Sequence, residues 1–105
     1  MAMRVEIPFD PALTCFDSRS PAIVLKDIPA STVELKVRIR NIGDIAGTSS
    51  KTLAYAGEGR IAKGALRHFP ACRGDSGAIE VRVQARDASG KVLATGRDDA
   101  FLRER

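Results

Sequence analysis

The stretch TVELKVRIR, residues 32–40, decides the fold class of this chain. Apolar and charged residues alternate along it, and this period of two is typical of a β-strand with one face buried and the other in water. We therefore predict a half-buried strand with a charged outer face. Its inward side chains are expected to be Val33, Leu35, Val37 and Ile39, and its outward side chains Glu34, Lys36, Arg38 and Arg40.

A second stretch, IEVRVQAR at residues 79–86, repeats this pattern. Its apolar positions are Ile79, Val81, Val83 and Ala85, which we expect to face inward. Asp87-Ala88-Ser89-Gly90 follows with residue types that favour a tight turn. Residues 91–95 then continue as a partner strand, so the region predicts a β-hairpin.

The rest of the chain predicts shorter strands at residues 5–7, 22–25, 52–55 and 60–66. Prolines bound the first two of these, because proline cannot donate to a sheet ladder. Residues 98–105 are compatible with a short terminal helix that docks through Phe101 and Leu102, and no long central helix is expected. The chain therefore reads as a single all-β domain over residues 1–105, a β-sandwich with Greek-key connections.

Positive charge is concentrated in the second half of the chain. The formal net charge is +4, whereas residues 1–50 hold six basic and six acidic side chains. Such a bias can attract phosphates or acidic lipid head groups, and it also occurs on soluble surfaces that bind nothing. Residues 51–75 are the most basic segment, which leaves an anion site and a solvated sheet edge as alternatives there.

Catalytic and metal sites find little support. His68 is the only histidine and no G-x-S-x-G motif is present, so we expect no hydrolase and no enzyme. The glycine-rich residues 57–64 lack the order of a P-loop. Cys15 and Cys72 lie 57 residues apart without a C-x-x-C motif, which predicts buried thiols and neither a metal site nor a cofactor. Whether these cysteines pair is left open by the sequence.

Other partner classes can also be weighed. The chain has no tryptophan and one tyrosine, so bases would find few aromatic side chains to stack on, and nucleic acid is not an expected partner. The first residues lack the apolar core of a signal peptide, and no apolar run has the roughly 20 residues needed to cross a bilayer. We therefore expect a cytoplasmic protein with no membrane span.

Several short motifs occur in a fixed order along the chain: Ile7-Pro8, Thr14-Cys15, Ser20-Pro21, Ile28-Pro29-Ala30-Ser31-Thr32, Pro70-Ala71-Cys72 and Gly77. This order resembles the phosphatidylethanolamine-binding protein family, in its bacterial form. The resemblance implies an all-β Greek-key sandwich with a small anion pocket at one end. It covers most of residues 7–95 in pieces of two to five residues each.

The chain departs from the family at the pocket itself. Where the family has an Asp-Pro-Asp-x-Pro loop, this chain has Arg40-Asn41-Ile42-Gly43-Asp44, and where the family has Gly-x-His-Arg it has Gly77-Ala78-Ile79-Glu80. Two hypotheses follow. The first is a short, divergent member that binds a phosphorylated or otherwise anionic small molecule or lipid head group. Its substitute ligand-binding residues would be Asp44, Arg67, His68 and Arg73. The second is a non-catalytic protein–protein interaction module that has lost the pocket and uses a strand edge or the charged face of residues 32–40.

Overall fold

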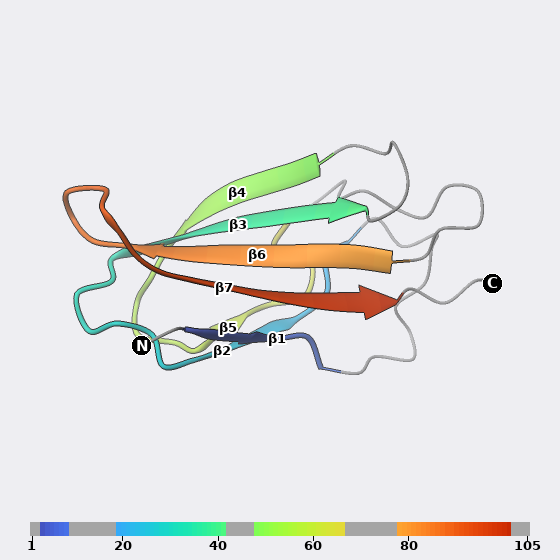
Figure 1. Ribbon diagram of the computed structural model, residues 1–105, viewed down its shortest axis with the longest axis horizontal. Helices are drawn as coiled ribbons and strands as arrows, with labels where there is room; N and C mark the ends of the chain where they lie inside the picture. Colours follow the sequence, from blue (N-terminus) through green and yellow to red (C-terminus); the bar gives the residue numbers. More distant parts are fainter. Residues whose placement is uncertain (1–2, 9–18, 42–47, 67–77, 102–105) are drawn as a thin grey trace.

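The computed structural model describes residues 3–8, 19–41, 48–66 and 78–101 (Figure 1). These residues form an all-β structure of two antiparallel sheets, without a helix in the described part. The three-stranded sheet has the order β1-β2-β5 and the four-stranded sheet the order β4-β3-β6-β7. The strands are β1 (Arg4–Glu6), β2 (Ile23–Lys26), β3 (Glu34–Asn41), β4 (Thr48–Ala54), β5 (Arg60–Ile61), β6 (Ala78–Arg86) and β7 (Val92–Phe101).

The two alternating stretches form the centre of the larger sheet. β3 and β6 pair antiparallel over their length, with Val37 opposite Val83 and Ile39 opposite Val81. β4 and β7 flank this pair. The predicted hairpin of residues 79–95 is therefore confirmed, and the turn residue Asp87 accepts hydrogen bonds from the backbone amides of Ser89 and Lys91.

One apolar core joins the two sheets. Its residues come from the inner faces of both sheets, and those of β3 and β6 are almost completely excluded from water. Burial of a Val, Leu or Ile side chain contributes roughly 1.5–3 kcal/mol relative to exposure. The core is therefore the main source of stability, and it consists of Met3, Val5, Ile23, Leu25, Leu35, Val37, Ile39, Ile61, Leu66, Ile79, Val81, Val83 and Ala85.

The Ser20-Pro21 motif has a structural role in this chain. The Ser20 side chain is fully buried, and its hydroxyl oxygen accepts a hydrogen bond from the Leu66 amide at 2.9 Å. The Ser20 amide in turn donates to the Leu66 carbonyl at 3.1 Å. These bonds fasten the segment before β2 to the segment after β5, which explains the serine without a ligand.

β1 of the smaller sheet lies beside β7 of the larger sheet, so the two sheets meet along this side of the molecule (Figure 1). Gly96 of β7 permits this approach, since a Cβ there would lie 2.6 Å from the Met3 carbonyl oxygen and 2.7 Å from a Val5 methyl carbon. Beyond β1, the Ile7 amide donates to the Asp98 carboxylate at 2.9 Å. The two sheets are therefore in direct contact along this side.

The prediction of a terminal helix over residues 98–105 is wrong for the part that the structure describes. β7 continues through Asp98 and Asp99 to Phe101, because the long strand β6 offers backbone partners along its whole length. Asp98 lies opposite Val81, and Asp99 lies opposite Glu80. Tertiary pairing thus overrides the local preference, as is common for short segments.

Two smaller expectations also need correction. Val33 was expected to face the core, but its side chain is 45% exposed, because it precedes β3 at the end of the sheet and the buried row begins at Leu35. The strand expected at residues 60–66 is limited to Arg60–Ile61, since a turn follows in which Gly64 has a positive φ of 85°. β4, by contrast, begins four residues earlier than expected.

Candidate functional site

The four residues proposed from the family resemblance, Asp44, Arg67, His68 and Arg73, lie outside the described residues. The same is true of Cys15 and Cys72. The anion pocket expected at these four residues, which we call the loop pocket, therefore stays a prediction. The same holds for the prediction that the two cysteines are buried thiols. The site described next lies on different residues, on the outer face of the four-stranded sheet.

Three arginines form a row across that outer face. The register places Arg38 of β3 opposite Arg82 of β6, and Arg82 opposite Arg97 of β7. Directly opposed like charges destabilise a sheet, and each such pair costs a few tenths of a kcal/mol to about 1 kcal/mol. The opposed arginines therefore destabilise the sheet unless a nearby negative charge compensates for them.

Glu80 is the counterion within this face. Its side chain is only 3% exposed, and its carboxylate accepts hydrogen bonds from Arg40 at 2.9 Å and from Arg97 at 3.0 Å. Arg82 completes the group with an ion pair at 3.6 Å. The Arg40 hydrogen bond, together with the charges of the arginines, lowers the pKa of Glu80 below its ordinary value although burial opposes this. One carboxylate thus serves three guanidinium groups.

The face as a whole keeps an excess of positive charge. Its described residues include six cations and three carboxylates, so the face carries three net positive charges. Such a surface attracts anions, with a strength that falls as salt rises. The cations are Lys36, Arg38, Arg40, Arg82, Arg86 and Arg97, and the carboxylates are Glu34, Glu80 and Asp99.

A small hollow of about 140 Å³ lies within this cationic face, lined by Lys36, Arg38, Arg82 and Gln84. In the described part of the chain, the side chains of Lys36 and Arg38 have neither an ion pair nor a hydrogen bond. They therefore hold donors that an anion in the hollow can use. We call these four residues the cationic hollow.

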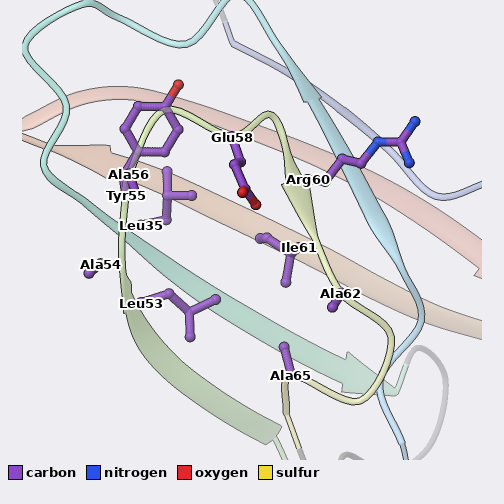
Figure 2. Close-up of a pocket in the computed structure, with 10 residues that line it drawn as sticks. All are labelled: Leu35, Leu53, Ala54, Tyr55, Ala56, Glu58, Arg60, Ile61, Ala62 and Ala65. Atoms are coloured by element: carbon purple, nitrogen blue, oxygen red, sulfur yellow. The ribbon is translucent and has the colours of Figure 1, made fainter.

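A second, apolar pocket of about 260 Å³ opens between β4 and β5, which lie at the ends of the two sheets away from β1 and β7. Leu35, Leu53 and Ile61 form its floor, and Glu58 and Arg60 are its two charged residues (Figure 2). A Lys51 hydrogen bond to the Ala65 carbonyl, at 3.1 Å, spans the space between the sheets beside the pocket. We call this space the edge pocket.

Comparisons with protein-family models, curated proteins and solved structures returned no match to this chain. Within the described residues, no three His, Cys, Asp or Glu side chains are grouped as metal ligands, and no helix there is long and apolar enough to span a membrane.

The charged alternation of residues 32–40 and 79–86 already indicated an outer face with cations. Sequence reasoning nevertheless missed the joint site of Lys36, Arg38, Arg82 and Gln84, because only the register brings β3 and β6 together. It also treated Glu80 as a loss from a family motif, whereas Glu80 is the buried centre of an arginine cluster.

Proposed function

We propose that this protein is a non-catalytic anion-binding domain whose cationic hollow accepts a phosphate group or a similar oxyanion. The observation that carries the proposal is the pair of unbonded cations, Lys36 and Arg38, beside Arg82 in one hollow. A guanidinium group presents planar donors that fit two phosphate oxygens at once, and a lysine ammonium adds a point charge. The Gln84 amide supplies a further donor.

Glu80 affects the same site in two opposing ways. Its ion pairs orient Arg40, Arg82 and Arg97 before a ligand arrives, and its negative charge competes with an anion for these guanidinium groups, which we expect to be the larger effect. Prior orientation reduces the entropy lost on binding. The hollow is small and its Arg38 side chain is exposed to water, so we expect weak binding that is sensitive to salt.

For the finer fold, we propose a Greek-key β-sandwich. β3 and β4 lie in one sheet, β5 joins the other, and β6 returns to pair with β3, which is a Greek-key path across two sheets. The order β4-β3-β6-β7 also follows the C′-C-F-G order of immunoglobulin-like sandwiches. Membership of the phosphatidylethanolamine-binding protein family is therefore a separate proposal, which rests on the short motifs alone.

The proposal is tested by amide-resolved NMR titration of ¹⁵N-labelled protein with phosphate and with phosphoethanolamine at low salt. We expect shifts clustered at residues 36–38 and 82–84, which are lost in Arg38→Gln. Arg60→Gln is the matched control, because Arg60 is an exposed arginine on the other sheet. Shifts confined to residues 42–47 and 67–77 would favour the loop pocket instead, and the absence of shifts would overturn both sites.

A further inference from the structure

The free edge of β4 is a second feature with binding potential. In the described part of the chain β4 pairs only with β3. Just after β4, the Tyr55 amide donates to the Val33 carbonyl at 2.9 Å. Backbone groups alternate in direction along an antiparallel strand. The backbone amides and carbonyls of Leu53 and Lys51 therefore also point toward β3, whereas those of Ser50 and Thr52 point away from it, toward the open edge.

The edge pocket lies on the inner side of this free edge. Inward side chains of a strand added to β4 would be in line with Leu53 and would face the space between the sheets, where the pocket opens (Figure 2). Its volume of about 260 Å³ is below the roughly 300–1,000 Å³ typical of small-molecule sites. The pocket therefore suits one or two apolar side chains of a larger partner.

The charges beside the edge are cationic on both faces. Lys51 lies on the inner face, and Lys36 and Arg38 lie on the outer face behind the small side chains of Thr52 and Ser50. An added strand would lie two strand spacings from β3, about 10 Å away. Lys36 or Arg38 on β3 and a glutamate on the added strand are together long enough to span that distance. An inward lysine on an edge strand disfavours pairing with neutral or basic strands. Lys51 already donates to the Ala65 carbonyl, so the partner needs acidic residues on the outer face only, beside Lys36 and Arg38.

We propose that β4 binds an extended segment of another protein, in which acidic and apolar residues alternate, by adding it to the four-stranded sheet. The backbone ladder supplies affinity, the edge pocket takes an apolar side chain, and the cations select the acidic residues. A second copy of this chain fits less well, because β4 contains Lys51 and no acidic residue, so two β4 edges would bring like charges together. The charge selection rests on the proposed anion-binding face.

The test uses a seven-residue peptide of alternating glutamate and valine, titrated into the labelled full chain. We expect slowed amide exchange at Ser50 and Thr52 and shifts at Leu53. Thr52→Pro removes an outward amide without breaking the ladder to β3, so binding should weaken about tenfold. Thr52→Val keeps that amide and should bind as the unaltered chain does. Equal binding by both variants would overturn the proposal.

Two further arms guard against ambiguity. If Thr52→Pro does not fold, a peptide N-methylated at its pairing positions takes its place, and its undiminished binding would overturn the proposal. A lysine–valine peptide that binds as tightly as the glutamate–valine peptide would do so too. Phosphate titration of Thr52→Pro separates this proposal from the preceding one, because shifts at residues 36–38 and 82–84 should persist when the edge no longer binds.

Discussion

The two faces of the four-stranded sheet come from the same strands and have opposite surroundings. On the inner face Val37, Ile39, Val81 and Val83 are fully buried against the smaller sheet. On the outer face the residues between them form the cationic hollow and its arginine row. Because strand side chains alternate, one element supplies both folding energy and a charged surface. The comparison teaches that the two properties can be altered separately, one residue apart.

The largest expected difference in stability comes from substituting two neighbouring residues that lie on opposite faces of the sheet. Ile39→Ala should lower the free energy of unfolding by about 3 kcal/mol, because it leaves a cavity at a fully buried site. The neighbouring substitution Arg38→Ala should change it by less than about 0.5 kcal/mol. Urea unfolding followed by circular dichroism measures both. A similar loss for the two variants would contradict the division of roles.

Gly96, on the inner face where β1 packs against β7, provides a second test of the comparison. Gly96→Ala should lower the free energy of unfolding by about 2 kcal/mol, since the new methyl group would collide with the Met3 backbone and Val5. Thr95→Ala, at the adjacent exposed position, is the control and should cost clearly less. If Gly96→Ala were neutral in thermal and urea unfolding, β1 would not pack on β7 as described.

Glu80 tests the outer face through pH. Glu80→Gln should cost about 1–2 kcal/mol near neutral pH, because hydrogen bonds to a charged group are weakened. The folded-state pKa of Glu80 is depressed below its ordinary value of 4.5. The unfolded chain therefore binds the proton more readily, so the contribution of Glu80 is present above that value and is lost as the pH falls through the folded pKa.

Urea midpoints at neutral and acid pH check this sign. The stability gap between the unaltered chain and Glu80→Gln should narrow as the pH falls below 4.5. Glu58→Gln, at an exposed glutamate near the edge pocket, is the control and should show no comparable gap. A gap that widened in acid would contradict the arginine cluster.

The smallest expected effect concerns the end of β7. Phe101 is 84% exposed at the edge of the outer face, so Phe101→Ser should change the free energy of unfolding by less than about 0.5 kcal/mol. A loss of several kcal/mol in urea unfolding would mean that this ring packs against part of the chain outside the described residues.

The alternation in the sequence was sufficient to predict the fold class, the two central strands and their inward and outward faces. Residues 32–40 and 79–86 carry a strong period-two pattern, which survives because one face must be buried. The terminal helix failed for residues 98–101, because pairing with β6 depends on a distant strand rather than on local preference. Val33 failed because the sequence does not show where the covering sheet ends.

The cationic hollow could not be predicted in the same way. Each arginine was visible as an outward residue, but the opposition of Arg38, Arg82 and Arg97 depends on the register of three strands. The burial of Glu80 depends on that register too, since the covering side chains come from β3, β6 and β7. The charge bias of the second half left an anion site and a solvated edge as alternatives at residues 51–75, and it did not point to Lys36 and Arg38 of β3.

The central claim is that anions bind at the outer face, where Glu80 competes with them for the arginines. The most direct test is the affinity for pyrophosphate of the unaltered chain, Glu80→Gln and Arg82→Gln, measured by NMR titration at one low salt concentration. We predict that Glu80→Gln binds about fivefold more tightly and Arg82→Gln about fivefold more weakly, equivalent to about 1 kcal/mol in each direction. Equal affinities for all three proteins would contradict the account.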